Sequence, residues 1–205
     1  MILENKLGIN TAAELARAEE GISKRKAAEM FESGFLDTLE AGTFSSLAAI
    51  HRYLFCEIYG FAGKVRDVDL AKGGFRFASV LYLAAALESI EKMPQRTFEE
   101  IIEKYVETNV AHPFREGNGR SARIWLNLIL KKELRMVVDW SRVDKDGYLA
   151  AMERSPVADA DVKKLLRAAL TDEIDDRGVY MRGIDASYHY EGYNVYRTEE
   201  LKSES

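Results

Sequence analysis

The 205-residue sequence contains one cysteine, three prolines and no long apolar run. The single cysteine, Cys56, excludes an internal disulfide and is typical of proteins in a reducing compartment. The acidic Glu4 lies close to the start, and no uninterrupted apolar stretch reaches membrane-spanning length. The sequence therefore predicts neither a signal peptide nor a membrane span, and we expect a cytoplasmic protein without a membrane partner.

An excess of positive charge is also missing. The chain has 29 Lys and Arg against 34 Asp and Glu, so its formal net charge is -5. This balance gives no electrostatic reason to expect direct binding to nucleic acid. A hydrophobic content of 47% and a charged content of 31% are typical of a globular protein. The length suits one domain with a sizeable core.

The most informative stretch is residues 112–123, His-Pro-Phe-Arg-Glu-Gly-Asn-Gly-Arg-Ser-Ala-Arg. Before it, the pair Thr97 and Glu100 forms a capping-box pattern that predicts a helix start, and Pro113 ends that helix. Apolar residues recur at helical spacing between these points: Phe98, Ile101, Ile102, Tyr105, Val106 and Val110. Another apolar set predicts a second, central helix: Ala122, Ile124, Trp125, Leu126, Leu128, Ile129 and Leu130. We thus expect a helix-loop-helix over about 97–133.

The chemistry of this stretch points to phosphate. Loop amides and the first turn of a helix present unpaired N–H donors and a positive dipole end, which favour an anion. Arg120 and Arg123 lie three residues apart in that first turn. Glu116 could hold a Mg²⁺ that also takes phosphate oxygens. His112, at the end of the incoming helix, could act as a general base toward a hydroxyl.

Each part also has an ordinary explanation. Gly-Asn-Gly alone is a common turn, and a single histidine is more often structural than catalytic. A base, an acid, two glycines and two arginines within twelve residues together favour a functional site.

The pattern His-Pro-Phe-x-(Asp/Glu)-Gly-Asn-Gly-Arg-x-x-Arg resembles the signature of Fic-domain proteins, and every position is met. The resemblance implies a compact all-α fold with a small β-hairpin flap over the active site. It also implies transfer of AMP from ATP to a hydroxyl side chain of a protein, with Mg²⁺. By position, His112 is the implied base and Glu116 the Mg²⁺ ligand. The implied nucleotide-binding residues are Phe114, Gly117, Asn118, Gly119, Arg120 and Arg123, where the two glycines and Asn118 form an anion hole and the arginines hold the outer phosphates.

A hairpin is predicted at about 64–78. Arg66 to Leu70 alternate polar and apolar, Gly73-Gly74 indicates a turn, and Phe75 to Phe77 alternate again. The open edge of such a hairpin can pair with an extended segment of a partner, although a purely structural hairpin is the simpler alternative. The resemblance assigns it to target positioning, with these residues: Lys72, Gly73, Gly74 and Phe75.

Other elements follow from periodicity and caps. Helices are predicted at these ranges: 11–20, 22–32, 43–58, 78–93, 142–154 and 159–174. His51 lies on an apolar stripe, so we interpret it as a core histidine with internal hydrogen bonds. We assign residues 1–175 to a Fic core, 176–197 to a C-terminal helical segment that Gly178 and Gly183 loosen, and 198–205 to a frayed polar tail.

The segment Ser187-Tyr-His-Tyr-Glu191-Gly192 carries the last pattern. Its rings could simply pack a terminal helix on the core. The spacing Ser-x-x-x-Glu-Gly also resembles the inhibitory motif of Fic proteins in the group (class III) where that helix is C-terminal. The resemblance implies that Ser187 and Glu191 are inhibitory and that Glu191 pairs with Arg123, because a carboxylate and a phosphate compete for one guanidinium fork. Tyr188 and Tyr190, beside this glutamate, are candidates for self-modification.

Alternatives remain for the activity and the partners. Glu191 could instead serve removal of AMP, which would make the chain a deAMPylase or a bifunctional enzyme, and relatives can transfer UMP or phosphate. A non-catalytic nucleotide-sensing module is the third hypothesis, and an intact His112 argues against it. The expected partner is a protein with a Tyr, Thr or Ser hydroxyl, and the resemblance suggests bacterial topoisomerase subunits and self-association.

Overall fold

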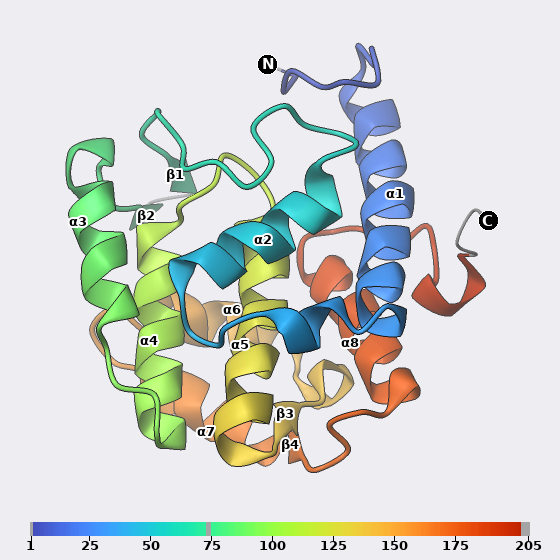
Figure 1. Ribbon diagram of the computed structural model, residues 1–205. Coiled ribbons are helices and arrows are strands. Elements are labelled where there is room, and N and C mark those ends of the chain that lie inside the picture. The colour runs from blue at the N-terminus through green and yellow to red at the C-terminus, as the bar shows by residue number, and fades with distance from the viewer. Residues whose placement is uncertain (1, 73–74, 202–205) are drawn as a thin grey trace.

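The computed structural model describes residues 2–72 and 75–201. Within these ranges the chain is mostly helical (Figure 1), which confirms the predicted all-α class. The helices are α1 (Ala12–Glu32), α2 (Phe44–Phe55), α3 (Val80–Glu91), α4 (Phe98–Ala111), α5 (Asn118–Leu134), α6 (Lys145–Arg154), α7 (Ala160–Ala168) and α8 (Arg177–Tyr190). Short 3-10 turns occur at Phe35–Thr38, Trp140–Arg142 and Thr198–Glu200. No helix in the described ranges is long and apolar enough to cross a membrane.

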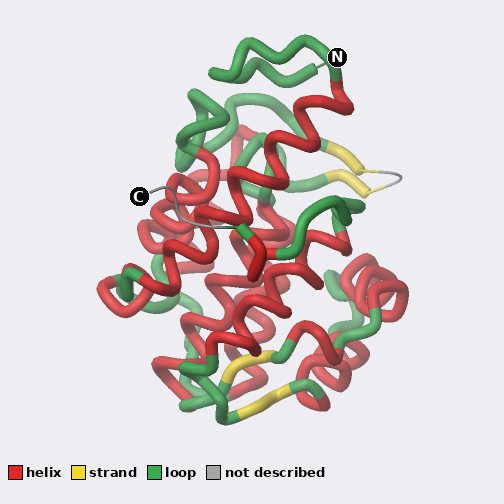
Figure 2. The backbone as a smooth tube through the Cα atoms, turned by 90° about the vertical axis from the view of Figure 1, so that its right-hand side faces the viewer, coloured by secondary structure: helices red, strands yellow, loops and turns green. Residues whose placement is uncertain are grey.

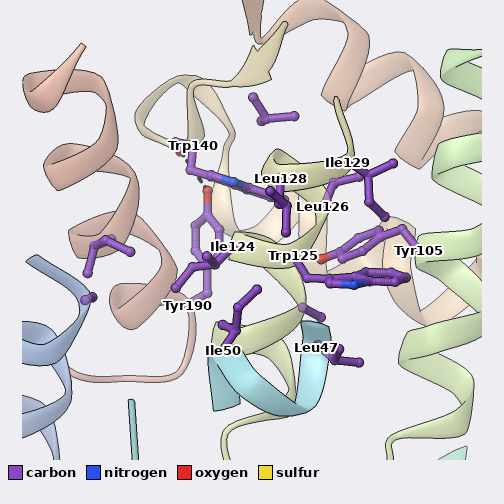
Figure 3. Packing of buried hydrophobic residues seen from close by; sticks show 14 of the residues in the cluster. Leu47, Ile50, Tyr105, Ile124, Trp125, Leu126, Leu128, Ile129, Trp140 and Tyr190 are labelled. Atoms are coloured by element: carbon purple, nitrogen blue, oxygen red, sulfur yellow. Dashed lines mark hydrogen bonds between the residues drawn. The ribbon is translucent and has the colours of Figure 1, made fainter. Parts of the chain in front are cut away.

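Helix α5 is the centre of the fold, as its all-round apolar character predicts. It packs against α2, α4 and α8, and Figure 3 shows its side chains inside the resulting core. Leu126, Ile129 and Leu130 are fully buried, and the indole of Trp125 donates a hydrogen bond to the Ser46 hydroxyl at 3.0 Å. This packing places the N-terminus of α5 next to the end of α4.

The predicted helix starts are present as local hydrogen bonds. The capping box joins Thr97 and Glu100 at the start of α4. The side chain of Thr43 accepts from the backbone N–H of Ser46 at the start of α2. Because these caps satisfy amides that the helices leave unpaired, they set the positions of α2 and α4 around α5.

Two of the predicted boundaries were wrong. The separate helices at 11–20 and 22–32 are one helix, α1, which continues through Gly21. A Cβ at Gly21 would lie 3.4 Å from the ring of Tyr196, so the glycine allows a close approach of the C-terminal segment rather than a break. The helix predicted over 159–174 ends at Ala168, because β4 (Leu170–Thr171) leaves it to pair with β3 (Val137–Val138).

The C-terminal region is also more ordered than predicted. Gly178 and Gly183 do not loosen the chain but lie inside α8, and Gly183 faces Trp140. Thr198 is fully buried and its hydroxyl donates to Asp185 at 2.6 Å, so the tail is not frayed at this position. We call residues 193–198 the C-terminal strap, because they cross α1 and tie α8 to it (Figure 1).

The predicted hairpin is present but shorter than expected. Strand β1 (Ala71–Lys72) pairs antiparallel with β2 (Phe75–Arg76), and Lys72 opposes Phe75. The turn residues Gly73 and Gly74 lie outside the described residues. Figure 2 shows this hairpin far from the β3–β4 pair, and Figure 1 shows it beside α3 and α4. The hairpin thus stands alone next to the helix-loop-helix.

Candidate active site

A cavity of about 560 Å³ opens where the hairpin, the end of α4 and the start of α5 meet. Helix α6 and the turn after it form its far side. Its walls include the residues Leu70, Phe75, Phe77, Asn109, His112, Glu116, Gly117, Gly119, Arg123, Met152, Glu153 and Glu191. A cavity of this size suits a small-molecule ligand.

His112 follows the last residue of α4 and lines this cavity. Its backbone is left-handed, with φ of 48°, which is uncommon for a residue with a side chain. Its N–H still donates to the Thr108 carbonyl at 3.0 Å, and its ring stacks on Phe77 with centroids 3.7 Å apart. The end of α4 and the hairpin together therefore aim the imidazole into the cavity.

Arg66 fastens this arrangement, a role that could not be predicted from its place in the expected strand. It is 2% exposed. Its guanidinium donates to the carbonyls of His112 at 2.8 Å, Val68 at 2.7 Å, Ala111 at 3.1 Å and Ala78 at 2.5 Å. One side chain thus joins both arms of the hairpin to the end of α4. The negative end of the α4 dipole favours the Arg66 cation at the end of this helix, although burial lowers the pKa of Arg66.

The loop from Phe114 to Gly119 is closed by its own side chains. Asn118 accepts from the Phe114 N–H at 2.8 Å and donates to the Phe114 carbonyl at 2.7 Å. Gly117 has φ of +74°, and a Cβ on it would lie 2.4 Å from the Phe55 ring. Asn118 therefore supports the loop, while the backbone of Gly117 and Gly119 at the start of α5 forms part of the cavity wall.

His51 is a core histidine, as predicted. It is fully buried, accepts at Nδ1 from the Gly63 N–H at 2.8 Å, and its Nε2 lies 2.8 Å from the Glu116 carbonyl. Burial lowers the pKa of His51 to about 4, so the ring is neutral near pH 7. Phe114 stacks on it with centroids 3.9 Å apart and is itself in the core, so its side chain supports the loop from beneath.

Glu116 and Arg120 are held together. Arg120 Nη2 lies 2.9 Å from Glu116 Oε1, and the same oxygen accepts from the Gly117 N–H at 2.9 Å. The Glu116 carboxylate lines the cavity and its side chain is 40% exposed. The Arg120 guanidinium, in contrast, is only 1% exposed and forms a second ion pair with Glu19 of α1. The structure therefore places Arg120 beneath the cavity rather than in its wall.

Arg123 lines the cavity, and its guanidinium bonds to residues at the C-terminal end of α8. Its Nε donates to the Ser187 hydroxyl at 2.6 Å and its Nη2 to the Ser187 carbonyl at 2.9 Å. Arg123 Nη2 also lies 3.0 Å from Glu191 Oε1, so the predicted ion pair is present. A Cβ at Gly119 would lie 2.5 Å from the same glutamate oxygen, which shows how closely Glu191 approaches the loop.

The two tyrosines of the Ser187–Glu191 segment are buried. Tyr188 is 0% exposed, and burial raises its pKa to about 12. The Tyr190 hydroxyl donates to the carbonyls of Trp140 at 2.9 Å and Val143 at 2.7 Å, and Figure 3 shows the ring beside Trp140. Both rings are therefore part of the core that holds α8 in place.

A divalent cation fits this site only together with a ligand. Among the described residues, no three His, Cys, Asp or Glu side chains come together as a metal cluster. Glu116 is one exposed carboxylate beside a loop suited to phosphate. This donor set matches Mg²⁺, which commonly takes one or two carboxylates and completes its shell with phosphate oxygens and water.

Fold and site together define a helical protein in which a glycine loop at the start of α5 and a histidine line one cavity. Residues 42–130 match the Fic/DOC family model. The chain is 30% identical over 166 residues to the probable protein adenylyltransferase y4lH of Sinorhizobium fredii, an alignment that covers 75% of this chain and 83% of the relative. The chain belongs to the Fic/DOC family.

Two further likenesses agree. The chain is 28% identical over 219 residues to protein adenylyltransferase VbhT of Bartonella schoenbuchensis, covering 95% of this chain but 45% of that protein, so it spans about half of that relative's length. The crystal structure of BepC from Bartonella tribocorum with bound AMPPNP has a TM-score of 0.70, 20% identity, and coverage of 83% of this chain and 93% of that chain. The second likeness shows the shared fold.

Proposed function

We propose that this chain is a protein adenylyltransferase that moves AMP from ATP to a hydroxyl side chain of a target protein. The observation that carries the proposal is the meeting of His112, the Gly117–Gly119 loop and Arg123 in one cavity. Binding phosphate needs only the glycines and the arginine, so the aimed histidine indicates chemistry. Relatives named protein adenylyltransferase and a neighbour with bound AMPPNP support the choice of nucleotide.

In this mechanism the loop amides bind the α-phosphate and Arg123 binds the terminal phosphate. A ring nitrogen of His112 takes the proton of the target hydroxyl while the oxygen of that hydroxyl bonds to the α-phosphorus. The bond between the α-phosphorus and the bridging oxygen breaks, and pyrophosphate leaves. Glu116 would hold Mg²⁺, which supplies charge neutralisation on the phosphates. Positioning and electrostatic stabilisation account for most of the expected rate.

The hairpin is the proposed platform for the target. Its exposed edge can pair with an extended segment of another protein. Phe77 in its second arm stacks on His112, so a segment bound to the hairpin would lie next to the imidazole.

Glu191 is the proposed inhibitor of the enzyme. Its carboxylate occupies the guanidinium that the terminal phosphate of ATP requires, and charge-assisted pairs of this kind are strong. Self-modification at Tyr188 or Tyr190 is a further part of the proposal. Because both hydroxyls are buried, it requires α8 to leave its place first, and a modified tyrosine would then prevent its return.

The test is transfer of label from α-labelled ATP with Mg²⁺ to protein, alone and with a cell lysate. Three forms are compared: the unaltered chain, Glu191→Gly, and Glu191→Gly with His112→Ala. Strong labelling by the single variant alone is expected. Labelling that survives the loss of His112 would contradict the assigned base.

Reversal is the second candidate, because the Glu191 carboxylate itself lines the cavity and could orient a water. A protein labelled by the Glu191→Gly variant serves as the substrate. Release of AMP by the unaltered chain, but not by the variant, would favour a deAMPylase or a bifunctional enzyme.

A further inference from the structure

Glu19, in the middle of α1, is a buried carboxylate that lies outside the family match. It is 2% exposed and stands 101 residues before its ion-pair partner Arg120. Its carboxylate also accepts from the hydroxyls of Tyr59 and of Tyr193, the latter at 2.8 Å. Burial alone would raise the pKa of Glu19, but Arg120 and these hydroxyl donors hold it below its ordinary value. Glu19 is therefore charged and fully engaged.

Arg120 is the group on which Glu19 acts. Its guanidinium lies 4.9 Å from the centroid of the Phe55 ring and 4.8 Å from that of Tyr193. Its Nη1 is directed to Glu19 and its Nη2 to Glu116. The guanidinium thus bonds to two carboxylates through different nitrogens, and Arg120 is not part of the cavity wall.

The geometry at Glu116 is asymmetric. The bonds from Arg120 Nη2 and from the Gly117 N–H, both 2.9 Å, end on the same oxygen, Oε1. The other oxygen, Oε2, takes part in neither bond. Because the carboxylate lines the cavity, this arrangement fixes one oxygen on the protein and leaves the second for the ligand side.

We propose that Glu19 is a positioning residue for the metal site, which keeps Arg120 on Oε1 of Glu116 and so keeps Oε2 available to a divalent cation bound with the nucleotide. The inference rests on the proposed function, because it requires Glu116 to hold the cation. Without the charge of Glu19, the guanidinium fork would pair with Glu116 through both oxygens, the geometry that arginine and a carboxylate prefer. Outer partners of metal ligands commonly contribute 10–100-fold to metal affinity.

The test uses Glu19→Gln in the Glu191→Gly background, so that α8 does not block the nucleotide. Binding of Mn²⁺ in the presence of AMPPNP is followed by electron paramagnetic resonance, and AMPPNP binding in EDTA by calorimetry. We expect about 10-fold weaker Mn²⁺ binding and unchanged metal-free AMPPNP binding. Labelling from ATP should recover at high Mg²⁺, so the apparent metal constant changes and kcat does not.

The neighbouring carboxylate provides a matched control. Glu20→Gln in the same background removes an equally buried charge from α1 that faces the strap and not Arg120. Unlike Glu20→Ala, it keeps an oxygen that can accept from the Val195 N–H, so the strap and its Tyr193 stay in place. It should leave Mn²⁺ binding unchanged. Arg120→Lys, which cannot span both carboxylates, should weaken Mn²⁺ binding as Glu19→Gln does, and it is the second variant if the first fails to fold.

The outcomes separate the two levels of the argument. If Glu116→Gln abolishes Mn²⁺ binding while Glu19→Gln and Arg120→Lys leave it intact, the positioning role is overturned and the proposed function stands. Equal losses of Mn²⁺ and of metal-free AMPPNP binding in Glu19→Gln would also overturn it, because they indicate a merely structural role. If Glu116→Gln binds Mn²⁺ as well as its background does, the assignment of the metal ligand in the proposed function fails.

Discussion

The side chain of Arg66 donates to the main-chain carbonyl of His112 at 2.8 Å across 46 residues of sequence. The same guanidinium bonds to Val68 on one arm of the hairpin and to Ala78 after the other. The cation of Arg66 therefore joins the hairpin to the proposed catalytic histidine, in addition to backbone bonds from Arg66 to Pro113 and from Ala78 to Val110. A displacement of either would require breaking a buried charged network.

This relationship predicts the effect of Arg66→Met. The variant keeps the length of the side chain but leaves several buried carbonyls without a donor. We expect a loss of about 2–4 kcal/mol in the free energy of unfolding. In the Glu191→Gly background we also expect at least about 10-fold slower labelling, because misplacement of a catalytic group by an ångström is costly. Urea unfolding and label transfer measure the two effects.

Arg96→Met is the matched control, because Arg96 is exposed and its side chain forms no ion pair among the described residues. It should change neither quantity measurably. Unchanged labelling by a folded Arg66→Met variant would contradict the link between Arg66 and His112.

If Glu191 inhibits the chain as proposed, changes in the C-terminal strap should raise its activity without altering the cavity. Glu20 accepts from the backbone N–H of Val195 at 2.9 Å, and Lys24 donates to the Tyr196 carbonyl at 2.6 Å. Glu20→Ala should loosen the strap, and with it α8 and Glu191. We expect about 5-fold faster labelling, since the loss of buried charge-assisted bonds is on the order of 1–3 kcal/mol.

In the Glu191→Gly background the same substitution should add nothing, because the proposed inhibitory carboxylate is already gone. Glu14→Ala, at an exposed position in the first turn of α1, is the control. A further increase on top of Glu191→Gly would show that Glu20 acts by another route.

The burial of neutral His51 predicts that the protein loses stability at acid pH. The folded pKa of about 4 lies below the value of about 6.5 expected for an unfolded chain. As the pH falls below 6.5, the unfolded state takes up the proton first, so stability present above that pH is lost as the pH approaches 4. The loss should amount to about 3 kcal/mol.

Urea unfolding at pH 7.5, 6 and 5 measures this slope. His51→Asn should lower stability at pH 7.5 and flatten the slope relative to the unaltered chain. His189→Asn, at an exposed histidine, should leave it unchanged. An equal slope in His51→Asn would mean that other groups cause the acid sensitivity.

Two glycines of similar backbone allow strain and packing to be separated. Gly34 has φ of +69°, and a Cβ there would have nothing within 4 Å, whereas Gly117 has φ of +74° and a Cβ there would meet Phe55 at 2.4 Å. Gly34→Ala should therefore cost about 1–2 kcal/mol from the left-handed backbone alone. Gly117→Ala should cost more and abolish AMPPNP binding in the Glu191→Gly background. Equal losses in thermal unfolding would show that the Phe55 contact is irrelevant.

Local patterns explain what could be predicted from the sequence. The capping box at Thr97, the helical spacing before His112 and the glycines after it are signals within a few residues of each other, so the helix-loop-helix was predictable. The pairing of Arg123 with Glu191 came from a resemblance and not from spacing.

What escaped prediction depends on tertiary contacts. Arg66 bonds to backbone carbonyls, and because every residue has a carbonyl, the sequence does not indicate which ones it will meet. Glu19 cannot be distinguished in the sequence from the other charged residues of its helix. Gly21 looked like a helix break, because the reason for a glycine there is the ring of Tyr196 from the other end of the chain. Such relationships become visible only when the fold brings the segments together.

Helix α8 carries Glu191 at its end and core side chains such as Tyr188 and Ile184 along its length. During synthesis, at about 5–20 residues per second, a ribosome adds this helix several seconds after His112. A nascent chain thus possesses its histidine and glycine loop while the α8 part of its core and its proposed inhibitor are still missing. The folding step that adds α8 to the core also brings Glu191 to Arg123. If Glu191 inhibits as proposed, a newly made molecule is therefore inhibited as soon as it reaches its native state.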